Sequence, residues 1–302
     1  MKVVFMGTPE FAVPVLSSLQ KSEHSVEAVV TVPDKLGGRS QNQLLESAVK
    51  KYAVKQGIRI LQPRNLKSSK FLQKLREIEA DVFVVVAFKK LPKLVWSIPT
   101  KGTINLHASL LPAYRGAAPI NWAVINGETK SGMTTFFIDQ KIDTGNILLQ
   151  KELEIAPDET AGNLHDKMMI HSGKLMLDTL KGIENNSIQA TAQDESGVTK
   201  APKIFFDQNK LDFKKSTKQL NNFIRGMSPY PTAWIKFNGK ILKIYKADPV
   251  ILSHSIEPGT IDTDYKTHFK VYTRDGYLKL REVQISGKRK MIIKDFLNGL
   301  RK

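Results

Sequence analysis

Apolar and polar residues alternate along the first half of the chain in a pattern that predicts strands and helices in turn. Short apolar runs bounded by Gly, Pro or Asp are typical of buried strands. We expect such strands at residues 2–6, 28–32, 58–61, 81–88, 103–106, 133–138 and 147–153. Apolar residues spaced three and four apart predict helices at residues 8–19, 44–56, 68–79 and 160–183. Apolar strands separated by helices indicate an α/β domain with a mostly parallel sheet covered on both faces.

The pattern changes beyond a polar stretch at residues 187–203, which predicts a linker because it holds few apolar and many turn-forming side chains. One helix is predicted after it, at residues 216–225. Short alternating runs follow, separated by Asn238-Gly239 and Asp275-Gly276, and the last of them predicts a strand at residues 291–293. These dipeptides favour tight hairpins, and a series of short strands indicates a small, OB-like β-barrel. We therefore expect a catalytic domain, a linker and a C-terminal β-barrel domain at residues 1–188, 189–204 and 205–302.

Composition excludes several kinds of chemistry. The chain has 302 residues and no cysteine, which excludes disulfides, thiol catalysis, cysteine-ligated zinc and iron–sulfur clusters. Its longest apolar run, residues 82–88, is far shorter than the roughly 18 residues that a membrane span needs. We therefore expect a soluble, cytoplasmic protein that does not contact a membrane.

Positive charge is concentrated in the last third of the sequence. Residues 201–302 hold 21 Lys and Arg against 9 Asp and Glu, so they carry +12 of the chain's net +17. This asymmetry indicates a polyanionic partner that touches the C-terminal part, although lysine-rich surfaces also serve solubility alone. The charge by itself therefore leaves two interpretations open, namely binding to nucleic acid and solubility alone.

A dense polar cluster follows the predicted strand at residues 103–106. Asn105 and His107 are two residues apart on extended backbone, so they point to the same side. The carboxyl ends of strands in open α/β sheets are where ligands bind. An amide donor beside an imidazole suits the stabilisation of a carbonyl oxygen that becomes negative. The alternative is a capped loop whose buried histidine has its hydrogen bonds satisfied.

A second candidate, Asp143, lies in a loop between two apolar strands. A carboxylate there can orient an imidazole, favour its charged form, and accept a proton directly or through one water. A lone aspartate in such a loop is more often a simple turn residue. Asp143 is therefore a candidate catalytic residue only in combination with Asn105 and His107.

Five stretches carry a resemblance to the folate-dependent formyltransferases. The specific one is NLHASLLP at residues 105–112, which is followed by RGAAPI at 115–120 and by IDTG at 142–145 as the family's second element. The opening FMGTPEFA at residues 5–12 resembles the branch that acts on methionyl-tRNA, and RGMSPYPTAW at 225–234 resembles the start of that branch's C-terminal domain. The resemblance covers essentially the whole chain in the family's order.

The resemblance implies a Rossmann-like formyltransferase domain followed by a tRNA-binding β-barrel. It implies transfer of a formyl group from 10-formyltetrahydrofolate to the α-amine of methionyl initiator tRNA, with no metal. The family's catalytic trio maps onto Asn105, His107 and Asp143. Asn105 and charged His107 would stabilise the oxyanion, and Asp143 would hold His107 charged and help remove the amine proton. The family also implies a monomer.

The resemblance further implies binding residues for the folate and the tRNA. Ser109, Leu110, Leu111 and Pro112 match the family's folate-binding stretch, and Phe88 and Lys89 belong to a second one. That second stretch departs from the family, because Ala87-Phe88-Lys89-Lys90 lacks the family's Gly and is one residue shorter. Arg39, in a loop with two glycines, takes the place of the basic residue that the family inserts near the tRNA acceptor end.

Two other functions fit parts of the sequence. A formyltransferase of the same fold could act on the amine of a sugar nucleotide or of glycinamide ribotide, neither of which calls for a C-terminal part with +12 charge. A non-catalytic RNA-binding protein on a degenerate enzyme scaffold would not need Asn105, His107 and Asp143 together.

Overall fold

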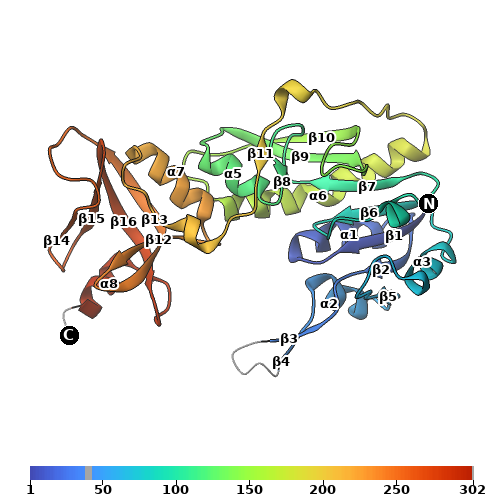
Figure 1. Ribbon diagram of the computed structural model, residues 1–302, viewed down its shortest axis with the longest axis horizontal. Coiled ribbons are helices and arrows are strands. Elements are labelled where there is room, and N and C mark those ends of the chain that lie inside the picture. Colours follow the sequence, from blue (N-terminus) through green and yellow to red (C-terminus); the bar gives the residue numbers. More distant parts are fainter. Residues whose placement is uncertain (38–42, 301–302) are drawn as a thin grey trace. The chain divides into compact units, whose positions relative to one another are not determined.

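The chain is described by a computed structural model, which covers residues 1–37 and 43–300 (Figure 1). Contacts within the chain divide it into two compact units, each of which is described by itself. The N-terminal unit comprises Met1–Gly116, Gly132–Leu153 and His165–Lys200. The C-terminal unit comprises Ala117–Ser131, Glu154–Leu164 and Ala201–Lys302.

A seven-stranded sheet forms the centre of the N-terminal unit, in the order β10-β9-β7-β6-β1-β2-β5. Its strands are β1 (Lys2–Gly7), β2 (Ser25–Val30), β5 (Ile60–Leu61), β6 (Val82–Val86), β7 (Thr103–His107), β9 (Lys130–Phe137) and β10 (Ile147–Glu154). The pairs from β5 through β2, β1 and β6 to β7 are parallel, and β9 runs antiparallel to β7. This confirms the predicted mostly parallel sheet, whose parallel strands end together at one edge.

Helices cover both faces of this sheet. On one face, Val4 and Met6 of β1 and Phe83 and Val85 of β6 pack with apolar residues of α3 (Ser69–Arg76) and α4 (Lys93–Trp96). Alternate strand residues point to the other face. There Thr179 of α6 (Ala161–Glu184) bonds Thr135 of β9 at 2.8 Å. The remaining elements of the unit are η1 (Glu10–Ala12), α1 (Val13–Gln20), β3 (Lys35–Gly37), β4 (Gln43–Leu45) and α2 (Ala48–Lys55).

The polar segment that follows α6 is bonded to the N-terminal unit as far as residue 200. Thr191 exchanges both backbone hydrogen bonds with Ile147, at 2.7 and 2.9 Å. Beyond η2 (Glu195–Gly197), β11 (Lys200–Ala201) pairs with β8 (Arg115–Gly116), and Arg115 N donates to Thr199 O at 3.0 Å. The chain therefore has fixed positions on both sides of residues 192–198.

An antiparallel half-barrel sheet forms the core of the C-terminal unit, in the order β12-β13-β16-β15-β14 with β17 beside β16. These strands are β12 (Ala233–Phe237), β13 (Lys240–Ile251), β14 (Ile261–Thr263), β15 (Phe269–Thr273), β16 (Gly276–Ile285) and β17 (Met291–Ile292). The helical elements are η3 (Phe206–Asn209), α5 (Pro119–Ile125), α7 (Thr217–Met227) and α8 (Ile293–Leu300). Helices α5 and α7 cross closely at Gly226, where a Cβ would stand 2.9 Å from Asn121 O. The tight turns predicted at Asn238-Gly239 and Asp275-Gly276 do connect neighbouring strands.

Several elements differ from the sequence prediction. Helix α8 begins at Ile293, where the sequence predicted the end of a strand, and α5 and α4 were not predicted at all. Helix α2 starts at Ala48 rather than residue 44, because Ser47 caps it by accepting a hydrogen bond from Lys50 N. No helix within residues 1–37 and 43–300 is both long enough and apolar enough to cross a bilayer.

Candidate functional site

Asn105 and His107 lie on one face of β7, near its carboxyl end. The register pairs Asn105 with Val85 of β6 and Phe136 of β9, so the Asn105 side chain is on the face covered by α3 and α4. His107 follows two residues later on the same face. Asn105 is half-buried and His107 is buried. The parallel strand β6 ends beside them, which places both polar residues at the edge where α/β sheets bind ligands.

The imidazole of His107 is oriented by a backbone carbonyl. Its Nε2 lies 2.9 Å from Tyr114 O. A carbonyl only accepts hydrogen bonds, so Nε2 must carry a proton. Nδ1 is therefore the nitrogen that can gain or lose a proton, and it faces Asp143 Oδ2 at 3.8 Å. That separation is too long for a hydrogen bond but lies within ion-pair distance, and both side chains are at most 14% exposed.

Asp143 is held by its backbone as well as by its carboxylate. Oδ2 accepts a 2.9 Å hydrogen bond from Gly116 N. The residue has φ +56°, a left-handed conformation in which Asn and Asp are enriched among residues other than glycine. Two residues on, a Cβ at Gly145 would stand 1.7 Å from Phe137 O, so only glycine lets the loop lie this close to β9. Asp143 thus reaches His107 from a loop pressed onto the neighbouring strand.

Asn105 is the member of the trio with uncommitted hydrogen-bonding groups. The structure gives its side-chain amide no partner among the described residues. A half-buried amide without a partner costs free energy unless water or a ligand bonds it. Asn105 is therefore suited to donate to a ligand oxygen beside His107.

The predicted folate-binding residues after β7 divide into buried and accessible ones. The Ser109 hydroxyl donates to Ala113 O at 2.6 Å, and its side chain is fully buried. Leu111 is also buried, and its backbone N–H donates to Thr134 Oγ1 at 3.0 Å and so is not free to bond a ligand. Leu110 and Pro112 are partly exposed. Ser109 and Leu111 thus shape this stretch from within, and Leu110 and Pro112 are the members that a ligand can touch.

The second predicted folate segment follows the carboxyl end of β6. Ala87 has φ +48°, which turns the chain directly after the strand. Phe88 is half-buried against the apolar cluster under α3 and α4, and Lys89 is exposed. Both therefore lie at the same sheet edge as Asn105 and His107. Arg39, the residue predicted to approach the tRNA, lies outside the described residues.

The side chains of Arg115, Gln193 and Glu195 are joined by hydrogen bonds, and sequence reasoning gave none of them a role. Arg115 donates to Gln193 Oε1 through Nε at 3.0 Å and Nη2 at 2.7 Å. It also pairs with the exposed Glu195 at 3.0 Å, and this hydrogen bond lowers the pKa of the Glu195 carboxyl below its usual range. Gln193 in turn donates to the loop that carries Asp143. Arg115 stood in a recognised motif, but Gln193 and Glu195 stood in a segment whose polar composition indicated only a linker.

The described part of the chain holds no group of three or more His, Cys, Asp or Glu side chains arranged to bind a metal ion. The residues around Asn105 offer hydrogen-bond donors and one carboxylate. These groups are suited to proton transfer and to the stabilisation of charge.

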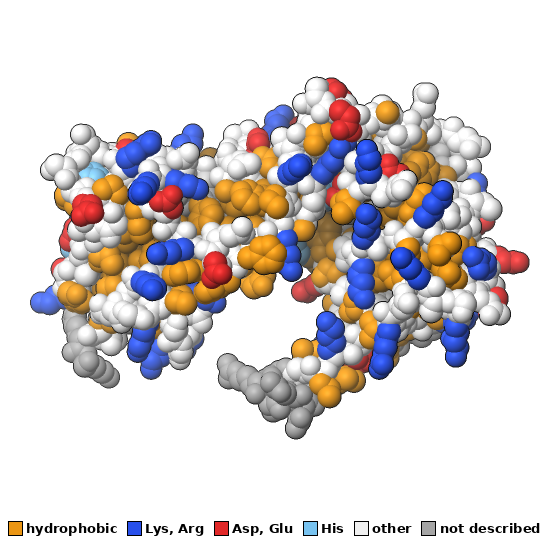
Figure 2. Space-filling model, in the orientation of Figure 1, with side chains coloured by type: hydrophobic (Ala, Val, Ile, Leu, Met, Phe, Trp, Pro, Cys, Tyr) orange, Lys and Arg blue, Asp and Glu red, His pale blue; other side chains and the backbone are white. Residues whose placement is uncertain are grey.

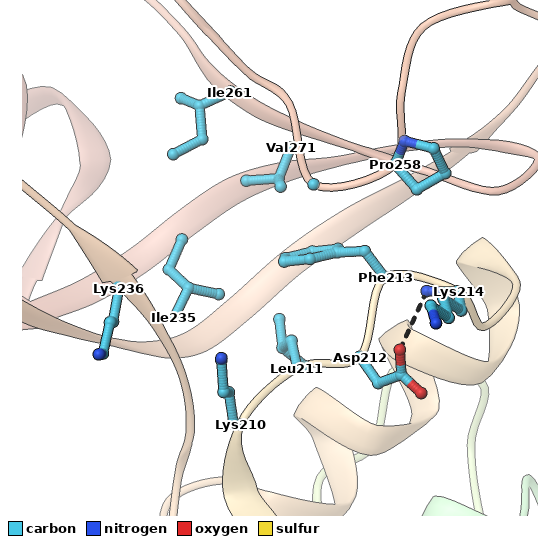
Figure 3. A pocket seen from close by; sticks show the side chains of 11 residues that line it. Lys210, Leu211, Asp212, Phe213, Lys214, Ile235, Lys236, Pro258, Ile261 and Val271 are labelled. Atoms are coloured by element: carbon cyan, nitrogen blue, oxygen red, sulfur yellow. Dashed lines mark hydrogen bonds between the residues drawn. The ribbon is translucent and has the colours of Figure 1, made fainter.

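The C-terminal unit presents a basic surface with one lysine-edged cavity. Lys and Arg side chains are scattered over the face of this unit in Figure 2. Between β12, the chain before α7, and the β14–β15 hairpin lies a cavity of about 350 Å³ (Figure 3). Its interior is apolar, and three exposed lysines, here called the lysine rim, line its edge: Lys210, Lys214 and Lys236. The one carboxylate beside them, that of Asp212, accepts a hydrogen bond from Lys214 N at 3.2 Å.

Known protein families match residues in both units of the chain. The pattern of the family described as Formyl transferase matches residues 1–180, and that of Formyl transferase, C-terminal domain, matches residues 203–301. The chain belongs to the formyl transferase family. Among formyl transferases, it is 46% identical over 305 residues to a methionyl-tRNA formyltransferase of Flavobacterium johnsoniae, covering 99% of this chain and 96% of that one. It is 47% identical over 306 residues to the same-named protein of Flavobacterium psychrophilum, again covering 99% and 96%.

Solved structures of other proteins share the fold of this one. WlaRD, a sugar 3N-formyl transferase, superposes with a TM-score of 0.69 at 22% identity, covering 96% of this chain and 99% of that one. HypX from Aquifex aeolicus, in complex with tetrahydrofolic acid, superposes with a TM-score of 0.68 at 17% identity, covering 100% of this chain and 48% of that one. At such identities the likeness concerns the fold alone.

Proposed function

We propose that this formyl transferase moves the formyl group of 10-formyltetrahydrofolate to the α-amine of methionyl initiator tRNA, for the initiation of protein synthesis. The observation that carries the proposal is the match to relatives named methionyl-tRNA formyltransferase at 41–47% identity. That match extends over at least 99% of the chain and so includes the basic C-terminal unit. A solved sugar formyl transferase shares the fold at 22% identity. A likeness at that level concerns the fold and does not indicate which acceptor this chain uses.

The geometry around His107 supports the chemical part of the proposal. The α-amine attacks the formyl carbon, the bond from that carbon to the folate nitrogen breaks, and the amine proton must reach the departing nitrogen. Asn105 donates its free amide N–H to the formyl oxygen as negative charge develops there. Charged His107 adds a positive charge beside the same oxygen. Asp143 faces Nδ1 at 3.8 Å, where it pairs with the charged imidazole, and it takes the amine proton directly or through one water.

The folate donor would bind along the edge formed by β6 and β7. It supplies an activated one-carbon group at the formyl oxidation level. Leu110, Pro112 and Phe88 offer partly exposed apolar surface for a flat ring, and Ser109 and Leu111 keep that surface in place. Exposed Lys89 can meet the anionic glutamate tail of the folate. The uncommitted amide of Asn105 between these surfaces and Asp143 is the structural feature that fits a formyl donor.

The tRNA would be held mainly by the C-terminal unit. We propose residues 1–188 as the catalytic domain, 189–204 as the linker and 205–302 as the tRNA-binding domain. Most of the net charge, +12 of +17, lies in residues 201–302, and neutralising phosphates releases counterions and supplies sequence-independent affinity. The lysine rim is part of this surface, and Arg39 would approach the acceptor end. We further propose a cytoplasmic monomer that acts without a membrane.

An acceptor comparison tests the proposal. The purified protein is incubated with 10-formyltetrahydrofolate and, in parallel, methionyl initiator tRNA, methionyl elongator tRNA or an amino-sugar nucleotide. We expect kcat/KM to be highest by orders of magnitude for the methionyl initiator tRNA. A higher kcat/KM for the amino-sugar nucleotide would show that the proposed acceptor is wrong, while formyl transfer itself would stand. Binding of tRNA without turnover of any acceptor would favour the non-catalytic alternative.

A further inference from the structure

Gln193 connects the candidate catalytic loop to Arg115, whose side chain is about 10% exposed. Its Nε2 donates to Asp143 O at 3.0 Å and to Gly145 O at 2.8 Å. Its Oε1 accepts from Arg115 Nε at 3.0 Å and from Nη2 at 2.7 Å. The side-chain amide therefore uses both of its donors and both of its acceptor sites.

The partners of Gln193 fix which way its amide points. The two carbonyl oxygens require donors, and the guanidinium requires an acceptor, so only one of the two amide orientations satisfies all four contacts. No other side chain of this length carries two donors and two acceptor sites at its end. A carboxylate lacks the donors, and an ammonium or guanidinium lacks the acceptor. The contacts thus require glutamine itself at this position.

The backbone around Gln193 is held on both sides. Thr191 bonds Ile147 through both of its backbone groups, and Tyr114 N donates to Thr199 Oγ1 at 2.8 Å. The chain between these points passes close to the folate-binding stretch, because a Cβ at Gly197 would stand 3.2 Å from Pro112 Cγ. The amide of Gln193 is therefore presented to the loop from a fixed segment.

These contacts close a ring around Asp143. Arg115 bonds Gln193, Gln193 bonds the carbonyl of Asp143, and the carboxylate of Asp143 accepts from Gly116 N, the residue after Arg115. The φ of +56° at Asp143 costs on the order of 1 kcal/mol for a residue with a Cβ, so the loop needs such bonds to stay in place. The direction of the carboxylate toward His107 depends on this backbone conformation.

We propose that Gln193 is a positioning residue of the active site, which holds Asp143 at the distance and direction that His107 needs. This inference rests on the proposed function, since it assigns a role within the same reaction. Gln193 does not touch the reacting atoms, and its whole effect passes through the Asp143 loop. The segment that composition marked as a linker would then complete the catalytic centre.

Gln193→Glu tests the proposal, because the new carboxylate keeps the bonds from Arg115 and loses both donors to the loop. Displacing a catalytic group by a fraction of an ångström to one ångström lowers rates by about 10- to 100-fold. We expect kcat to fall by that factor and the KM for methionyl-tRNA to stay within about twofold. Glu195→Gln is the matched control, since exposed Glu195 bonds the same Arg115 without reaching the loop, and it should keep kcat within about threefold.

A double variant separates positioning from a general structural role. If Gln193 acts through Asp143, Gln193→Glu added to Asp143→Asn should lower kcat no further than Asp143→Asn alone. Losses that multiply would overturn the proposal, as would near wild-type kcat in Gln193→Glu or an equal loss in Glu195→Gln. Thermal melting checks that each variant is folded. If Gln193→Glu melts early, Gln193→Ala, where water can bond the freed carbonyls, is carried through the same comparison.

The activity of the wild-type protein distinguishes a failure of the proposed function from a failure of the role given to Gln193. A wild-type enzyme without formyl transfer refutes the proposed function. An active wild-type enzyme with an unaffected Gln193→Glu variant refutes only the role of Gln193.

Discussion

Replacing Asp143 by asparagine removes one negative charge and leaves the local structure in place. Asparagine tolerates the φ of +56° at this position. Its Oδ1 can accept the 2.9 Å bond from Gly116 N that the carboxylate now accepts. The bonds from Gln193 go to the backbone and do not depend on the side chain. We therefore expect the free energy of unfolding to change by no more than about 0.5 kcal/mol.

The functional cost of Asp143→Asn should be large. With its Oδ1 on Gly116 N, the asparagine presents a neutral amide oxygen to His107 Nδ1 in place of the carboxylate oxygen, which lies 3.8 Å from that nitrogen. A neutral amide cannot form the ion pair with a charged imidazole that a carboxylate forms. The site loses both the charge that supports His107 and the group that accepts the amine proton. Loss of general acid–base help is worth about 10²- to 10⁴-fold, so kcat should fall by that factor, equivalent to ~3–5 kcal/mol in the barrier.

The assay measures kcat and KM at saturating folate donor, with thermal melting of each sample. Asp139→Asn is the matched control, because this carboxylate lies in the same loop and bonds Lys141 N at 3.0 Å and the Thr144 hydroxyl at 2.7 Å. We expect the control to keep most of its turnover. A kcat for Asp143→Asn within about fivefold of wild type, or an equal loss in Asp139→Asn, would refute the role given to Asp143.

Three further outcomes are expected. Asn105→Ala should lower kcat by about 10²- to 10³-fold with unchanged melting, since it removes one donor to the developing oxyanion; a loss below tenfold in steady-state kinetics would exclude that role. Alanine at all three lysine-rim positions should weaken tRNA binding and reduce the slope of log affinity against log salt by about 2–3; a filter-binding salt series with an unchanged slope would show that the rim touches no phosphate. Asp275→Asn should lower stability at neutral pH by ~1 kcal/mol, because the carboxylate accepts from the first backbone N–H of α7 at Thr217. Hydrogen bonds from Thr217 lower the pKa of Asp275 below its ordinary value of about 3.9, so its contribution is full above that pH and is lost as pH falls through the lowered pKa. Urea melts at pH 3 and pH 7 check this, and an equal difference between wild type and variant at both pH values would contradict it.

Much of the fold could be predicted because its signals are local. The strands β1 and β6 each show an unbroken apolar run, and the turns at Asn238-Gly239 and Asp275-Gly276 depend on backbone conformations that these residues favour. Helix α8 was missed although Ile293, Phe296 and Leu297 have helical spacing, because the apolar run at residues 291–293, with two β-branched residues, favoured a strand. Helix α5 has seven residues, too few for its periodicity to stand out.

The candidate site could be predicted only in part from the sequence. Asn105 and His107 share a face because strand alternation demands it, which two residues suffice to reveal. The approach of Asp143 to His107 joins positions 36 residues apart and is set by how the loop lies on β9, which no spacing encodes. Gln193 gave no signal, since a polar residue in a polar segment has the same composition whether it is solvated or bonded on all four sides.

The most direct test of the proposed function follows the formyl carbon itself. The protein is incubated with 10-formyltetrahydrofolate labelled in the formyl group and with methionyl initiator tRNA, and the aminoacyl ester is then hydrolysed by base. The label should appear in N-formylmethionine, and the Asp143→Asn variant should transfer it at least 100-fold more slowly. Label that stays on the folate, or that enters an amino-sugar nucleotide in preference to the methionyl-tRNA when both are present, would contradict the proposed function.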